Sequence, residues 1–239
     1  MRGVLKMELY HVLTRGIERR KIFLDKKDYL RFVHDLFEFN DEQPACSGRL
    51  RIFRNSQCND VVRRCIEEGE EKQQKEPRKF LVDLLAFTLM QNHYHLFISV
   101  KNRKLLTLFM RKLNGGYARY FNERYKRKGP LFESRFKSVL VHNEAHFIHL
   151  PYYIHCNPLD FKMPEWRKRK IADYQKALEF LENYRWSSHA DYIGKKNFPS
   201  VTQREFLLEY FGGEEGYKND IKTWLENFEG IREKFSLEE

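Results

Sequence analysis

Apolar and polar positions follow two different periods along the first 160 residues. Four short runs are rich in apolar residues and predict strands: residues 9–15, 80–90, 93–100 and 131–141. Three longer segments repeat apolar residues every three or four positions and predict helices: residues 25–37, 103–127 and 143–157. Gln91-Asn92 predicts a turn between the two central strands, so these should form a hairpin. The mixture predicts an α+β fold, with helices packed on a central antiparallel sheet.

The pattern changes after Pro158. Only helical segments follow, at about 171–183, 187–193, 202–211 and 214–228. We therefore predict an α+β domain over residues 1–160 and an all-helical C-terminal extension over 161–239. Within the first part, residues 41–78 are dense in charge and read as a polar insertion, with a short helix over 59–70.

Composition restricts the class of protein. Of the 239 residues, 41% are hydrophobic and 15% aromatic, which is too many for a disordered chain. No apolar run approaches the roughly 18 residues of a membrane span, and Met1–Lys6 lacks the apolar stretch of a signal peptide. We therefore expect a cytoplasmic protein. The four cysteines include no Cys-x-x-Cys pair, which argues against a disulfide framework and a zinc ribbon.

The net charge of +10 is concentrated in one segment. Residues 101–140 contain 12 Lys and Arg but two Asp and Glu, whereas the rest of the chain has 32 of each. Seven aromatic residues interleave with these cations. Cations that neutralise phosphates, next to rings that stack on bases, predict a single-stranded nucleic-acid site. A solvated helix with its aromatic residues facing the core remains an alternative reading.

Two histidines on one predicted strand are the first candidates for chemistry. Side chains alternate along a strand, so His93 and His95 share one face and Tyr94 lies on the other. Two imidazoles at this separation can ligate one divalent metal ion. Pairs of histidines at this spacing also occur by chance, so a role in packing stays open.

The helix over 143–157 carries the second group of candidates. Tyr153 and Asn157 are four residues apart and therefore share a face, which His149 extends by one turn. The alternative is a core-facing aromatic stripe with Asn157 capping the helix before Pro158. Together with the histidine pair, the group suggests a tyrosine nucleophile. A free phenol has a pKa near 10 and needs a base or a metal-polarised phosphate to react near neutrality.

Five stretches, in order along the chain, resemble the REP-associated tyrosine transposases, an IS200-like branch of the single-tyrosine HUH transposases. The central one carries the signature of a histidine pair separated by one hydrophobic residue. The resemblance covers most of residues 8–195 and rests on these stretches: His11 to Gly16 with Ile22-Phe23, Gln91-Asn92-His93-Tyr94-His95-Leu96, Tyr120 to Ser138, Tyr153-Ile154-His155-Cys156-Asn157-Pro158, and Tyr184-Arg185-Trp186-Ser187-Ser188.

The resemblance implies a role for each matching residue. His93, His95 and Asn157 would ligate Mg²⁺ or Mn²⁺, and Tyr153 would form a 5′-phosphotyrosine on single-stranded or hairpin DNA. The location implied is the bacterial cytoplasm or nucleoid, and relatives include both monomers and homodimers. His149 is a candidate general base for the phenol. The cations expected to bind DNA are Arg111, Lys112, Arg119, Arg124, Lys126, Arg127, Lys128, Arg135 and Lys137.

Some features depart from the family pattern, among them Tyr94, which is bulkier than the usual aliphatic residue between the histidines. Pro151, two residues before Tyr153, should either begin the helix or kink it. The insertion over 41–78 is longer than expected at that place. The residues after 161 carry no chemistry that their sequence identifies.

Three hypotheses for function follow. The first is a metal-dependent single-stranded DNA endonuclease and strand transferase that acts in DNA transposition and recombination. The second is a domesticated relative that binds structured single-stranded DNA or RNA without cutting it. The third is an unrelated metal hydrolase that uses His93 and His95, which would activate water and form no covalent bond between protein and DNA.

Overall fold

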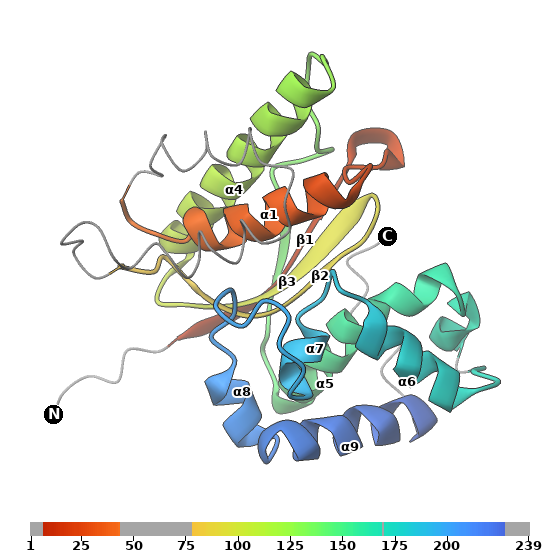
Figure 1. Ribbon diagram of the computed structural model, residues 1–239. Helices are drawn as coiled ribbons and strands as arrows, with labels where there is room; N and C mark the ends of the chain where they lie inside the picture. Colours follow the sequence, from red (N-terminus) through yellow and green to blue (C-terminus); the bar gives the residue numbers. More distant parts are fainter. Residues whose placement is uncertain (1–6, 44–77, 169, 228–239) are drawn as a thin grey trace, which may run out of the picture.

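The computed structural model describes residues 7–43, 78–168 and 170–227 (Figure 1). Most of the predicted insertion over 41–78, including its helix over 59–70, lies outside these residues. The described part confirms the α+β fold. Its sheet has four antiparallel strands in the order β2-β3-β1-β4. The strands are β1 (Glu8–Arg15), β2 (Asp83–Leu89), β3 (His93–Val100) and β4 (Lys137–Leu140).

The last strand is shorter than the apolar pattern predicts. Leu131 to Phe136 forms a loop, and only Lys137–Leu140 pairs with β1. The loop still follows the end of β1, because the backbone N–H of Glu133 donates to the carbonyl of Arg15. Tertiary hydrogen bonds therefore replace the regular ladder over the first half of the predicted strand.

One face of the sheet is covered by α1 (Lys26–Glu38) and α4 (Arg103–Arg124), as Figure 1 shows. The first helix begins at a capping box, in which Asp25 and Asp28 each accept a hydrogen bond from the backbone of the other. Tyr94, Leu96 and Ile98 of β3 enter the core on this face. These alternate residues of β3 pack in this core, so His93 and His95 lie on the opposite face of the sheet.

Gly115 and Gly116 do not interrupt α4. A Cβ atom at residue 116 would lie 2.3 Å from the ring of Phe39, whereas a Cβ at residue 115 would meet nothing within 4 Å. Gly116 therefore allows the C-terminal end of α1 to approach α4, and Gly115 has no such role.

The two glycines give a matched pair of stability predictions. Gly116→Ala should lower the free energy of unfolding by about 1–3 kcal/mol, because the buried Phe39 ring must move. Gly115→Ala should raise it by about 0.5–1 kcal/mol, because alanine favours the helix. Denaturant unfolding of both variants measures the difference. Equal effects of the two substitutions would contradict the assigned contact.

The opposite face carries α5 (Glu144–Cys156) and the C-terminal helices. Asn143 caps the start of α5, and the helix continues through Pro151, so it does not begin at the proline. Two 3₁₀ turns follow, η3 (Asn157–Phe161) and η4 (Pro164–Lys168). The remaining helices are α6 (Tyr174–Asn183), α7 (His189–Tyr192), α8 (Glu205–Tyr210) and α9 (Gly213–Asn227).

The C-terminal helices share one apolar core with α5 and the sheet. Phe97 of β3, Ile154 of α5, and Tyr217 and Ile221 of α9 belong to the same buried cluster. The division at residue 160 remains a prediction, and the two sides of it are packed together around α5. Among the described residues, no helix has the length and apolar character needed to cross a membrane.

Candidate active site

His93 and His95 lie near the start of β3, on the face of the sheet that α5 covers. Their ring centroids are 5.1 Å apart, and the side chains are buried, at 8% and 0% exposure. Tyr94 points into the core beneath α1, where it packs against Phe32. The alternation expected from the sequence is therefore present.

Each imidazole has a hydrogen-bond partner that bears on its tautomer. Nδ1 of His93 lies 2.7 Å from Oδ1 of Asn92, and Nδ2 of Asn92 donates to the carbonyl of Arg19. Because the amide oxygen only accepts, Nδ1 of His93 must donate. In the neutral ring, the lone pair then resides on Nε2. A ligand nitrogen oriented through its other ring N–H is typical of metal-binding histidines.

His11 is the corresponding partner of His95. It lies on β1, and its Nε2 is 2.9 Å from Nδ1 of His95, with the two rings stacked at 5.1 Å. When Nδ1 of His95 donates this bond, its Nε2 carries the lone pair, as in His93. His11 therefore orients His95, and in this tautomer Nε2 is the nitrogen free to ligate in both rings.

Tyr153 of α5 lies directly beside this histidine cluster. Its ring meets His11 and His95 edge-on, at centroid distances of 5.9 and 5.8 Å. The neighbouring Tyr152 faces the C-terminal helices, where its hydroxyl donates to Asp220 at 3.3 Å. Burial, followed by the charge of Asp220, raises the pKa of Tyr152. Of the two tyrosines, Tyr153 is therefore the one placed for chemistry at the histidines.

Asn157 lies one turn beyond Tyr153 and is fully buried. Its Nδ2 donates to the Tyr153 carbonyl at 2.8 Å, and its Oδ1 accepts from Nη2 of Arg167 at 3.0 Å. The guanidinium also donates from Nη1 to the Tyr153 hydroxyl at 3.4 Å. Asp160 holds Arg167 with both carboxylate oxygens, at 2.8 and 2.7 Å. Arg167 thus joins the candidate nucleophile to the candidate amide ligand.

The donor set fits a divalent ion at the two histidines. Both rings have Nδ1 in a hydrogen bond, which favours Nε2 as the ligating atom, and imidazole suits many divalent metals. Among the described residues, no group of three or more His, Cys, Asp and Glu side chains converges to form a complete metal site. Oxygen ligands from phosphate and water would have to complete the coordination. The Asn157 oxygen is already bonded to Arg167.

His149 has a partner on α9. Its Nδ1 accepts a hydrogen bond from the Trp224 indole at 2.9 Å, and burial lowers its pKa. In the neutral ring the remaining proton then resides on Nε2, so both nitrogens are committed. This arrangement gives His149 no basic nitrogen to offer to the phenol of Tyr153.

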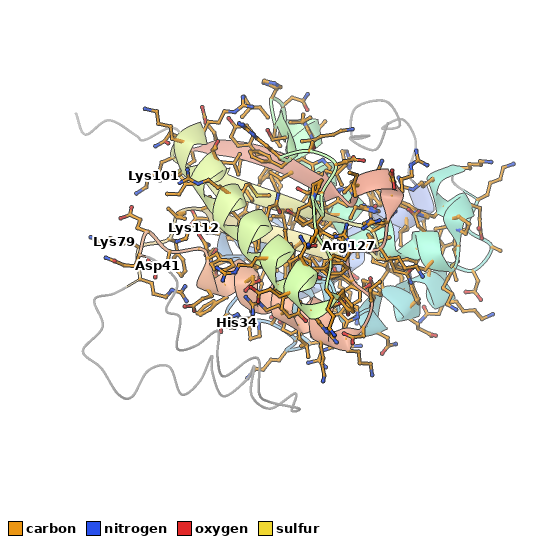
Figure 2. All side chains as sticks on the ribbon, turned by 90° about the horizontal axis from the view of Figure 1, so that it is seen from above. His34, Asp41, Lys79, Lys101, Lys112 and Arg127 are labelled. Carbon is orange, nitrogen blue, oxygen red and sulfur yellow. The ribbon has the colours of Figure 1, made fainter. Side chains whose placement is uncertain are left out.

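The cations predicted to bind DNA differ in whether the protein already pairs them and in how exposed they are. Arg124 is paired with Asp25 and Asp28, Arg119 with Glu123, and the ammonium of Lys112 with the carbonyls of Asp41 and Gln43. Figure 2 shows Lys112 beside Asp41, with Arg127 beyond the C-terminal end of α4. Arg127 bonds to Asn122 and to the carbonyl of Pro130. Five predicted cations are exposed to solvent: Arg111, Arg119, Lys126, Lys128 and Arg135. Lys137 is half-buried on β4.

Sequence reasoning missed His11 and Arg167 as parts of this site. His11 lies in the opening strand that resembles the family, but the register that stacks it on His95 joins residues 84 apart. Arg167 lies in the segment without recognisable chemistry, and the turns η3 and η4 bring it back to α5. Neither residue has a local sequence signal for these contacts.

Paired histidines on a central strand, with a tyrosine from the covering helix beside them, are the arrangement expected of a single-tyrosine HUH protein. Residues 49–157 match the family model "Transposase IS200 like". No curated protein sequence matches the chain. Among solved structures, it is similar to one described as "Structure of the REP associates tyrosine transposase bound to a REP hairpin". That similarity covers 82% of this chain and 83% of the other, at 10% identity and a TM-score of 0.39.

Proposed function

We propose that the protein is a metal-dependent endonuclease and strand transferase for single-stranded DNA, acting through a covalent 5′-phosphotyrosine. The family match supports a transposase-type function. The observation that carries the finer proposal is the position of Tyr153, whose ring meets His95 and His11 edge-on beside His93. A nucleophile at a metal-binding histidine pair suits the transfer of a phosphodiester bond.

The reaction transfers one bond and conserves its energy. The Tyr153 oxygen bonds to phosphorus as its proton leaves to solvent, and the bond from phosphorus to the 3′ oxygen of the upstream strand breaks. That oxygen takes up a proton and leaves as a free hydroxyl, while the downstream strand stays attached to Tyr153. His93 and His95 would hold Mg²⁺ or Mn²⁺, which when bound supplies Lewis-acid polarisation of the scissile phosphate.

Arg167 assists the same step in two ways. It positions the Tyr153 hydroxyl and the Asn157 side chain, and it neutralises negative charge at the reacting oxygen. Asp160 fixes its planar guanidinium, so that one nitrogen points at the Tyr153 hydroxyl and another at Asn157. A fixed cation beside the attacking oxygen stabilises the negative charge that moves between oxygen and phosphate. Trp166 packs on Tyr153 from the same turn and donates its indole N–H to Asp160, which restrains both groups.

The substrate that we propose is hairpin DNA with a single-stranded flank, which is the substrate that the resemblance to the REP-associated tyrosine transposases implies. The exposed cations after α4 would contact its phosphates. The corresponding location is the bacterial cytoplasm or nucleoid. Monomeric and homodimeric forms both remain compatible with this proposal.

The test is covalent capture of labelled DNA. The protein is incubated with hairpin DNA labelled at either end, with and without Mn²⁺, and separated on a denaturing gel. We expect the fragment on the 3′ side of the cut to migrate with the protein only when metal is added. Metal-dependent cleavage without an adduct would instead indicate water as the nucleophile.

A second candidate function is a binder of structured single-stranded DNA or RNA that does not cut. The observation that favours it is the bond from Arg167 to the Asn157 oxygen, which occupies the expected third ligand. Binding without any metal-dependent adduct, over the same range of hairpin substrates, would support this alternative.

Substitution of Arg167 gives a graded prediction. Arg167→Ala should lower the single-turnover rate of adduct formation by about 10²-fold at saturating DNA, because a fixed donor at the reacting oxygen is lost. Arg167→Lys should recover part of this rate, since it keeps the charge without the planar fork. Lys168→Ala removes the same charge from the next, exposed residue and should leave the rate unchanged. An equal loss in both alanine variants would contradict the role of Arg167.

A further inference from the structure

A second basic segment lies outside the stretch in which the net charge is concentrated. Residues 15–21, from the last residue of β1 toward α1, contain four Arg and Lys and one carboxylate, Glu18. Arg19 and Lys21 are exposed, and Arg20 is half-buried. No carboxylate in the described part of the chain pairs with these three side chains, in contrast to Arg124 and Arg119 of α4. Arg19 and Lys21 therefore present their charges to solvent.

This segment is hydrogen-bonded to the turn that precedes His93. The backbone N–H groups of Gly16 and Ile22 each donate at 2.8 Å, to the carbonyls of Asn92 and Gln91. The side chain of Asn92 donates to the Arg19 carbonyl at 3.3 Å and accepts from His93. Two hydrogen bonds thus join the backbone of Arg19 to an imidazole of the candidate active site.

The same segment also pairs with the loop that follows α4. Ile17 donates to the carbonyl of Leu131, Glu133 donates to the carbonyl of Arg15, and Gly16 forms a bridge with Phe132. In Figure 1 the two segments lie side by side at one end of the sheet. The loop after α4 brings further exposed cations to that end: Lys126, Lys128 and Arg135.

The backbone of the segment is strained. Glu18 and Arg19 have φ angles of 53° and 57°, in the left-handed region that residues other than glycine rarely adopt. A Cβ atom on Gly16 would lie 2.4 Å from the carbonyl oxygen of Arg20, so the turn is also closely packed. Such conformations persist where surrounding contacts enforce them, and they concentrate at functional sites.

We propose that Arg19, Arg20 and Lys21, with Lys128 and Arg135, bind phosphates of the single-stranded DNA that flanks the cleaved bond. Guanidinium groups match phosphate oxygens in paired hydrogen bonds, and the ammonium groups add charge. This inference rests on the proposed function, because it places these phosphates beside the one held at His93 and His95. The segment would set the position of the strand, and Tyr153 would do the chemistry.

The test compares two triple variants of the full chain with equal changes in charge. Arg19, Arg20 and Lys21 are replaced together by Gln in one variant, and Lys101, Arg103 and Lys104 in the other. The second set is exposed at the opposite end of α4, where Figure 2 marks Lys101. The probe is a DNA hairpin with a single-stranded extension of mixed sequence, and binding is measured without metal between about 50 and 200 mM salt.

We expect the Arg19/Arg20/Lys21 variant to bind about tenfold more weakly at the lower salt concentration. Its salt dependence should flatten by about 0.7 in log–log slope for each single-strand phosphate that the variant no longer neutralises. The affinity of the Lys101/Arg103/Lys104 variant should change little. Both variants should bind a hairpin without the extension as tightly as the wild type does. An equal loss in the two variants, or an equal loss on the hairpin alone, would overturn the proposal. Wild-type binding without any adduct would count against the proposed cleavage and leave this comparison intact.

Discussion

Replacement of Tyr153 by Phe is expected to abolish the covalent adduct between protein and DNA, with a loss of more than about 10³-fold. The substitution removes only the attacking oxygen and keeps the ring that packs against His11, His95 and Trp166. The hydrogen bond from Arg167 to that hydroxyl is long, at 3.4 Å. Folding and DNA affinity should therefore be preserved, as measured by thermal unfolding and by binding without metal.

Tyr152→Phe provides the matched control for this experiment. Tyr152 is the adjacent residue on α5, it is also buried, and its hydroxyl donates to Asp220 on α9. Loss of that hydroxyl should lower stability slightly and leave the adduct in place. If Tyr153→Phe still forms an adduct and Tyr152→Phe does not, the nucleophile has been assigned to the wrong tyrosine.

Replacement of His95 by Gln should reduce metal-dependent adduct formation by at least about 10²-fold. His95 supplies one of two candidate imidazole ligands, and His11 fixes its orientation. Loss of a residue that only supports a ligand typically costs 10- to 100-fold in metal affinity or activity, so loss of the ligand itself should cost at least that. Glutamine retains a polar side chain of similar length at this buried position. The measurement is the yield of adduct as Mn²⁺ is titrated.

His34→Gln is the control for the loss of a buried histidine. His34 lies on α1, on the other side of the sheet, and is 4% exposed (Figure 2). Its replacement should change the unfolding temperature without altering the Mn²⁺ dependence. An unchanged Mn²⁺ titration in the His95 variant would show that His95 is not a ligand, and would favour a role in packing.

Sequence alone predicted those elements whose structure depends on residues close together in the chain. The hairpin of β2 and β3 was predicted because two apolar runs flank a turn, and β3 spans the predicted residues 93–100. The helix over 143–157 was found with its N-cap at Asn143. The strand over 131–141 was predicted too long, since its first half bonds irregularly to the end of β1. Apolar composition does not distinguish such a loop from a regular strand.

The candidate site was only partly predictable for the same reason. His93, His95 and Tyr153 each follow from a local period, in a strand or a helix, combined with the family resemblance. Their closeness depends on α5 lying across the face of β3, which no local pattern specifies. His11 and Arg167 reach the site through a strand register and two 3₁₀ turns, so their contribution required coordinates.

The sequence by itself determined the class of fold, the shared face of the histidine pair, the identity of the candidate tyrosine and the excess of positive charge. The tertiary structure decided which cations remain available. Folding brings Asp25 and Asp28 to Arg124 and backbone carbonyls to Lys112, while Arg19 and Lys21 stay exposed beside the turn of His93. Charge counts are additive along a chain, but ion pairing depends on distances between residues far apart in sequence. The basic surface of this protein therefore differs from the basic stretch of its sequence.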